Sequence, residues 1–167
     1  MPESASPKPL RLLALHGPNL NTLGSREPHI YGSMTLDEIN QRLVARGDEL
    51  GCEVICFQSN HEGALVELIQ SARDGADAII INPAAYSFTS VAMVDALKTF
   101  EGPIIELHIS NIHARDELHR HSKISAGAKA VICGLGPYGY ILAMQAAAQM
   151  LGALPPAMPP ALRLGPR

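Results

Sequence analysis

The feature that most constrains the fold of this chain is an alternation of short apolar segments with longer amphipathic ones. The apolar segments lie at residues 11–15, 53–57, 78–81, 104–108 and 130–133. Residues 78–81 are apolar at every position, as expected of a strand that is covered on both faces. Strands that alternate with helices predict an α/β domain with a parallel sheet.

Capping signals place the helices between these strands. A helix is expected after Thr35, because Thr35 followed by Glu38 matches a capping box. A second helix should end near Gly75, a third should span residues 90–100, a short fourth should follow Asn111, and the last should cover residues 138–151. Since crossovers between parallel strands are right-handed, we expect a flavodoxin-like, doubly wound five-stranded sheet with strand order 2-1-3-4-5.

The length of 167 residues fits a single catalytic α/β domain, which we place at residues 10–152. The Pro-rich ends, residues 1–9 and 153–167, are predicted to be disordered or loosely held tails. No apolar run approaches the ~20 residues that a membrane span needs, and the polar N-terminus does not resemble a signal peptide. Three cysteines without metal-binding spacing favour a reducing, cytoplasmic location.

Charge and small motifs exclude several functions. The net charge of -3 and the 4% content of aromatic residues argue against a nucleic-acid partner. The GxGxxG match at residues 134–139 follows the last strand, so we interpret it as a tight turn, with a flavin or nucleotide site as the alternative. None of the four lysines follows a strand, which leaves a Schiff-base mechanism without a nucleophile.

Polar residues gather at the carboxyl ends of four of the predicted strands, at residues 16–21, 58–62, 82 and 106–111. Carboxyl ends of parallel strands share one edge of the sheet, so these residues predict a concave polar site there. Each of them singly could also cap a helix or hold a loop. Glu106 and His108 are more specific, because they alternate on one face of an apolar strand and would be costly to bury unless paired. Such a pair suits proton transfer.

The segment at residues 23–33 is a long loop, which in a compact domain is often a lid. It carries Arg26 and Tyr31. The two side chains could form a surface stacking pair, or Arg26 could favour the phenolate form of Tyr31 and make it a base.

Five segments together resemble the type II dehydroquinase family: LALHGPNLNTLGSREPHIYG, FQSNHEGALVELI, INPAAYSFTSVAMVDAL, IELHISNIHARDELHRHS and GLGPYGY. The resemblance covers about residues 11–151. It implies a dehydratase that converts 3-dehydroquinate to 3-dehydroshikimate by anti elimination through an enolate, in the shikimate pathway or in quinate breakdown. It also implies no metal or cofactor, and a dodecamer built from trimers.

The same resemblance implies roles for individual residues. Tyr31 would remove the proton next to the substrate ketone, Arg26 and Arg115 would lower its pKa, and Asn19 would hold a water that stabilises the enolate. His108, oriented by Glu106, would protonate the departing hydroxyl. Asn82, Ile109 and Ser110 would bind the substrate in their own subunit. Asp95 would reach the site of a neighbouring subunit.

Three positions depart from the family pattern. Phe88 stands where the family usually has His, His119 where it usually has Arg, and Ala84 where it usually has Gly. The usual residues at the first two positions contact substrate hydroxyls. The chain is therefore expected to be a dehydroquinate dehydratase or, alternatively, a relative with an altered substrate, reduced catalysis or none.

Overall fold

The computed structural model describes residues 8–25 and 27–154, without the side chain of Tyr31. Apart from residues 8, 9, 153 and 154, the two predicted tails lie outside the described residues. Ala153 and Leu154 pack against the hydrophobic core at the end of the last helix.

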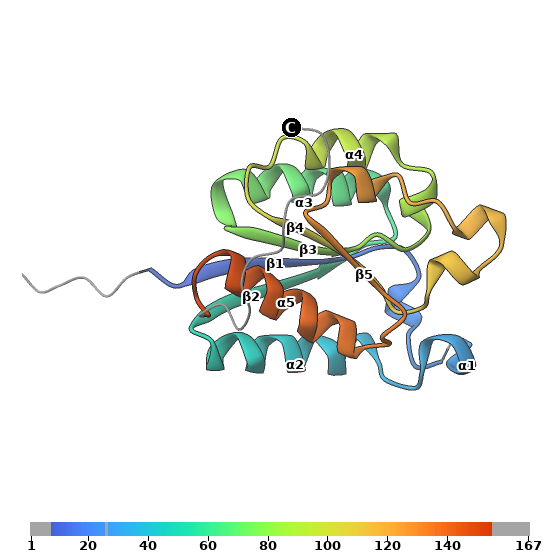
Figure 1. Cartoon of the computed structure of the whole chain (residues 1–167), viewed down its shortest axis with the longest axis horizontal. Helices are drawn as coiled ribbons and strands as arrows, with labels where there is room; N and C mark the ends of the chain where they lie inside the picture. Colours follow the sequence, from blue (N-terminus) through green and yellow to red (C-terminus); the bar gives the residue numbers. More distant parts are fainter. Residues whose placement is uncertain (1–7, 26, 155–167) are drawn as a thin grey trace, which may run out of the picture.

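Five parallel strands form one sheet in the order β2-β1-β3-β4-β5, which confirms the predicted topology (Figure 1). The strands are β1 (Leu10–His16), β2 (Cys52–Gln58), β3 (Ala78–Asn82), β4 (Ile104–His108) and β5 (Ala130–Cys133). The two central strands pair with His16 of β1 opposite Asn82 of β3. Their last residues therefore lie next to each other at the carboxyl edge of the sheet.

Helices cover both faces of the sheet (Figure 1). Helices α2 (Leu36–Glu49) and α5 (Tyr138–Met150) lie on one face, and α3 (Glu62–Gly75) and α4 (Val91–Leu97) lie on the other. Alternate strand residues point to opposite layers: Leu12 and Ile80 pack with the first pair of helices, whereas Leu13 and Ile79 pack with the second. This arrangement confirms the doubly wound fold, and none of the described helices is long and apolar enough to cross a membrane.

The capping box predicted at the start of α2 is present. The Thr35 hydroxyl accepts from the backbone amide of Glu38 at 3.3 Å, and the Glu38 carboxylate accepts from the backbone amide of Thr35 at 2.7 Å. These reciprocal bonds satisfy two amides that the first helical turn leaves without partners. The helix therefore begins where this local signal predicts.

The predicted fourth α-helix is wrong. The chain between β4 and β5 instead forms three 3-10 turns, at Ile112–Ala114, Glu117–His119 and Ile124–Gly127. Asn111 and Asp116 each cap the backbone two residues later, at 3.1 Å and 3.0 Å. Such caps compete with an α-helix, because they start a new short turn before the previous one can extend. The predicted lid loop also contains a short helix, α1 (Pro28–Tyr31).

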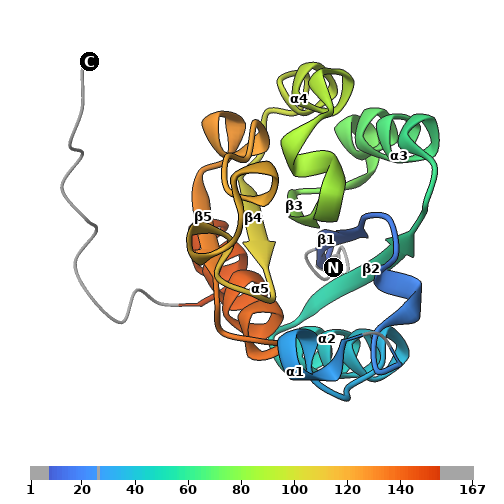
Figure 2. The same cartoon turned by 90° about the vertical axis from the view of Figure 1, so that its right-hand side faces the viewer.

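Both irregular segments lie at one end of the sheet. In Figure 1 the strands run towards the right, and α1 and the segment between β4 and β5 extend beyond their ends. Figure 2 looks onto this edge, where α1 lies in front of α2. The chain order reverses direction between β1 and β3, the position at which doubly wound sheets usually bind ligands.

Candidate active site

A pocket opens at the carboxyl ends of β1, β3 and β4. The loop after β1 contributes Asn19, the end of β3 contributes Asn82, and the end of β4 contributes His108. Eight of the residues expected at the site line this one pocket: Asn19, Asn82, Phe88, His108, Ile109, Ser110, Arg115 and His119. The sheet edge thus brings together side chains that are up to about a hundred positions apart in sequence.

Four expected residues are placed differently. Arg26 lies outside the described residues, and Tyr31 ends α1 with a side chain that is not described. Glu106 lies fully buried behind His108 and does not line the pocket. Asp95 is exposed on α4, where its carboxylate pairs with Lys98 at 3.4 Å, so it does not reach the pocket of its own chain.

The end of β2 braces the pocket and does not line it, contrary to the expectation that all four strand ends would meet there. The side-chain oxygen of Asn60 accepts from the backbone amide of Asn19 at 2.8 Å and from the Gln58 amide at 3.0 Å. Gln58 also donates to the carbonyl of Gly17 at 3.2 Å. The strand order explains the difference, because β2 is an edge strand of the sheet and β1 lies between it and the other strands that reach the pocket.

Glu106 and His108 form the expected pair. His108 Nε2 lies 2.6 Å from Glu106 Oε1, and both side chains are buried. Ser125 donates its hydroxyl to the second carboxylate oxygen, also at 2.6 Å. Burial alone would raise the pKa of Glu106, but the polar contacts with His108, Ser122 and Ser125 outweigh it and hold that pKa below its ordinary value. An ionised Glu106 orients the imidazole and leaves Nδ1 as the nitrogen that can act on a ligand.

Ser125 was not identified from the sequence. It lies 19 positions beyond Glu106, on a 3-10 turn that packs against β4. A serine in a loop is too common to single out, and only the packing of this turn onto the strand brings its hydroxyl to the carboxylate.

The backbone that joins β3 to the pocket is tightly packed and partly strained. A Cβ atom at Gly17 would come within 2.3 Å of the carbonyl oxygen of Pro83, so only glycine allows the β1 and β3 ends to approach this closely. Ala84 has a φ of 52°, in the left-handed region. This conformation costs a residue with a Cβ about 1–2 kcal/mol and is the reason that glycine suits the position.

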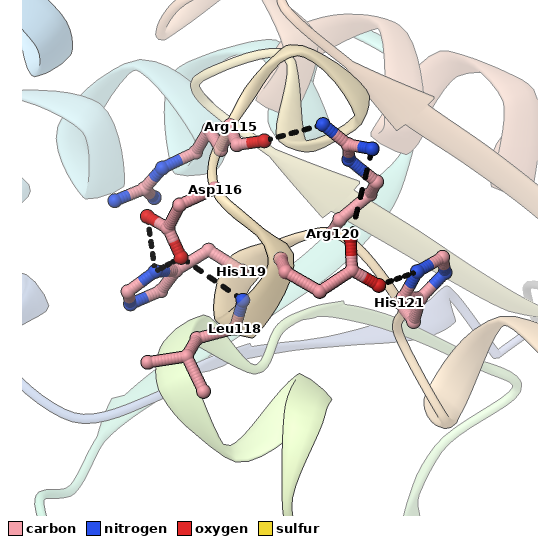
Figure 3. Close-up of polar contacts among 7 residues, drawn as sticks. Arg115, Asp116, Leu118, His119, Arg120 and His121 are labelled. Atoms are coloured by element: carbon pink, nitrogen blue, oxygen red, sulfur yellow. Dashed lines mark hydrogen bonds and ion pairs between the residues drawn. The ribbon is translucent and has the colours of Figure 1, made fainter.

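Phe88 and His119, two of the three residues that depart from the family pattern, contact each other. The Phe88 ring stacks near His108, with ring centres 6.4 Å apart, and meets the His119 ring edge-on at 5.6 Å. Asp116 holds His119 in place, since both its carboxylate oxygens lie 2.8 Å from Nδ1 (Figure 3). Phe88 thus stands between the two pocket imidazoles and gives this wall an apolar surface.

Other chemical groups lie away from the pocket. The four lysines all belong to the described residues, and none of them lines it. Within residues 8–25 and 27–154 there is no cluster of three or more His, Cys, Asp or Glu side chains suited to a metal ion. The GxGxxG segment forms a turn into α5, with Gly134 and Gly136 at positive φ, as predicted.

Fold and site together define a doubly wound α/β protein equipped for proton transfer by a buried carboxylate–imidazole pair. A sequence profile described as Dehydroquinase class II matches residues 10–148. The 3-dehydroquinate dehydratase of Methylococcus capsulatus is 57% identical over 140 residues, covering 83% of this chain and 95% of that protein. The catabolic 3-dehydroquinase of Verticillium alfalfae is 52% identical over 139 residues, covering 83% of this chain and 93% of that protein.

A solved structure agrees with these matches. The crystal structure of type II dehydroquinase from Propionibacterium acnes is similar with a TM-score of 0.81 at 45% identity, covering 83% of this chain and 96% of that one. The chain therefore belongs to the class II dehydroquinase family.

Proposed function

We propose that the chain is a type II 3-dehydroquinate dehydratase, a carbon–oxygen lyase that forms 3-dehydroshikimate and water. The observation that carries the proposal is the Glu106–His108 pair, which is buried at the end of β4 with His108 on the pocket wall. The names and the similarity of the relatives support the same activity. The elimination needs one group that removes a proton from carbon and one that protonates the leaving hydroxyl.

In the proposed mechanism Tyr31 is the base. Its phenolate takes the proton from the carbon next to the ketone, and the electron pair moves into the carbonyl to form an enolate. Arg26 and Arg115 favour the phenolate, because a nearby cation lowers the pKa of a phenol. Arg115 lines the pocket, which supports this role. Asn19, also on the pocket wall, holds the water that stabilises the enolate oxygen.

His108 completes the elimination. As the enolate collapses, the carbon–oxygen bond breaks, a carbon–carbon double bond forms, and the imidazolium gives its proton to the departing hydroxyl, which leaves as water. Glu106 supports this step by holding Nε2 at 2.6 Å and by stabilising the protonated ring. The reaction needs no cofactor, since every proton moves between the substrate and side chains of the protein.

Substrate binding is assigned to the residues around this pair. Asn82 and the backbone amides of Ile109 and Ser110 hold the carboxylate region of the substrate, in keeping with their positions on the pocket wall. We further propose that the protein is cytoplasmic and assembles as a dodecamer built from trimers, in which Asp95 completes a neighbouring subunit's site. The exposure of Asp95 away from its own pocket is consistent with that role.

The test is an ultraviolet assay with the purified full-length chain and 3-dehydroquinate. Formation of 3-dehydroshikimate creates a conjugated enone, so absorbance should rise with time and in proportion to the protein. The His108→Ala variant serves as the control for contaminating activity, because it should lose the elimination. Absence of any absorbance change with the wild-type protein would reject the proposed activity.

A second candidate function follows from Phe88 and His119. Phe88 offers no hydrogen bond, so a substrate hydroxyl that faces it loses a partner, and His119 is shorter than arginine and engaged by Asp116. These contacts favour a relative that acts on a different polyhydroxy keto acid, or that binds its ligand with little or no turnover. One hydrogen bond to a charged group is worth roughly 1.5–3 kcal/mol, so either change weakens recognition by about tenfold or more.

The Phe88→His variant separates the two candidates. If the dehydratase assignment is correct and Phe88 costs a hydrogen bond, kcat/KM on 3-dehydroquinate should rise about tenfold. Phe57→His makes the same change at an exposed position on β2, outside the pocket, and should leave kcat/KM unaltered. An equal or lower kcat/KM in Phe88→His would favour the altered-substrate or non-catalytic alternative.

A further inference from the structure

A chain of buried polar side chains leads from helix α2 to the pocket wall. His16, the last residue of β1, is fully buried, and its Nε2 lies 2.8 Å from the side-chain oxygen of Asn40 on α2. Its Nδ1 lies 3.4 Å from the hydroxyl of Tyr140 on α5. The amide nitrogen of Asn82 donates to that same hydroxyl at 2.9 Å. Four elements far apart in sequence thus meet in one continuous set of hydrogen bonds.

With the Asn40 oxygen facing His16, the donor and acceptor of each hydrogen bond in this series are determined. The Asn40 oxygen can only accept, so His16 Nε2 carries the proton and donates. In a neutral imidazole Nδ1 is then an acceptor, and the Tyr140 hydroxyl must donate to it. The hydroxyl oxygen is left to accept from Asn82, as observed. Each link therefore determines the orientation of the next.

The protonation states of the buried groups keep this direction constant. Burial lowers the pKa of His16 to about 4, with the Asn40 hydrogen bond opposing the shift only in part, so the ring is neutral near pH 7. Burial also raises the pKa of Tyr140, which keeps its proton available for donation. Neither group titrates in the range where an enzyme of this kind would operate.

Asn82 is held at both ends of its amide. Its oxygen accepts from the backbone amide of Ala84 at 3.2 Å, while its nitrogen donates one hydrogen to Tyr140. An amide nitrogen has a second hydrogen, and Asn82 lines the pocket. Rotation of the amide by half a turn would place its nitrogen against the Ala84 amide and its oxygen against the Tyr140 oxygen. The Ala84 amide and the hydrogen bonds from His16 through Tyr140 therefore favour the same one of the two possible orientations.

We propose that His16 and Tyr140 are positioning residues, which hold the Asn82 amide as a hydrogen-bond donor towards the pocket and so select a ligand oxygen at that point. The part that concerns the substrate carboxylate rests on the proposed function, whereas the hydrogen-bond direction does not. Because the donor faces the ligand in both the ground state and the transition state, its loss should weaken binding more than it slows the chemical step.

The kinetic test removes one hydroxyl. Tyr140→Phe deletes both the acceptor for Asn82 and the donor to His16, and it should raise KM for 3-dehydroquinate about tenfold while kcat changes by less than about threefold. Tyr138→Phe is the matched control, because it removes a hydroxyl from an exposed tyrosine of the same helix that does not line this pocket. A KM in Tyr140→Phe equal to that of the control would overturn the proposal.

A double variant separates positioning from a general structural effect. If Tyr140 acts through Asn82, the Tyr140→Phe/Asn82→Ala protein should have the same KM as Asn82→Ala alone. If the Tyr140 hydroxyl had only a general structural role, its removal would raise KM further in the Asn82→Ala background, and this additive result would count against the proposal.

A spectroscopic test on the wild-type protein needs neither turnover nor a variant. The ¹⁵N chemical shifts of the His16 ring, assigned by through-bond correlation from the backbone, should report a neutral imidazole with the proton on Nε2 at pH 7. An imidazolium, or a ring protonated on Nδ1, would refute the proposed direction of hydrogen-bond donation, which runs from Asn82 through Tyr140 to His16. If the wild-type protein shows no turnover but the His16 shifts are as expected, the proposed function is rejected. The proposed orientation of Asn82 is then still supported.

Discussion

The buried imidazole of His16 makes a quantitative prediction about stability and pH. In the unfolded chain this histidine titrates near 6.5, whereas burial lowers its pKa in the folded protein to about 4. Between these two values the unfolded chain binds the proton and the folded protein does not. Protonation therefore favours unfolding, and the contribution of His16 to the free energy of unfolding is complete above pH 6.5 and falls as the pH decreases towards 4.

The magnitude follows from the two pKa values. At 1.36 kcal/mol for each pKa unit, the lowering from 6.5 to about 4 corresponds to a maximum of about 3 kcal/mol. Linkage places about 2 kcal/mol of this loss between pH 7 and pH 5, and most of the rest by pH 4. The group is almost wholly buried, so solvent screens this effect little. Against a total stability of roughly 5–15 kcal/mol, the loss is large enough to measure.

The assay is urea unfolding of the full chain at half-unit steps from pH 7.5 to pH 4, for the wild type and for His16→Gln. Glutamine does not titrate and retains an amide donor that can reach Asn40. The carboxylates titrate in both proteins, so the difference between the two free energies of unfolding reports the contribution of His16 alone. The free energy of unfolding of the wild type should fall relative to the variant by about 2 kcal/mol between pH 7 and pH 5. Parallel curves for the two proteins would refute the reasoning.

Three further variants test the assigned roles. Tyr31→Phe should abolish turnover while 3-dehydroquinate still binds in a calorimetric titration; near-normal turnover would remove Tyr31 as the base. His108→Ala should stop dehydration while deuterium from solvent still exchanges into the substrate, and normal dehydration would contradict the acid role. Ser125→Ala should lower the free energy of unfolding at pH 7 by about 2 kcal/mol in urea titrations, because it removes the hydroxyl that donates to a charged, buried oxygen of Glu106; an unchanged value would show that the hydrogen bond contributes nothing.

Local signals in the sequence determined most of the fold. Strands β4 and β5 occupy the predicted residues, and β1, β2 and β3 extend the predicted ranges by one or two residues. Helix α2 starts at its capping box because that signal is complete within four consecutive residues. The strand order also followed, since right-handed crossovers leave few arrangements for five parallel strands.

The Glu106–His108 pair was predictable for a similar reason. Two residues that alternate along one strand must point to the same face, and a buried charge requires a partner. The wrong helix prediction was also local in origin: the side chains of Asn111 and Asp116 divide the segment after β4 into short turns, where one short helix was expected after Asn111.

Only the tertiary structure decided which polar residues act together. The hydrogen bond between His16 and Tyr140 spans 124 positions, and that between Asn82 and Tyr140 spans 58. No periodicity or spacing encodes such contacts, because they depend on how α5 packs against the ends of β1 and β3. The contact between Phe88 and His119 has the same origin: the sequence identified both as unusual residues, and the fold brought them onto one wall of the pocket.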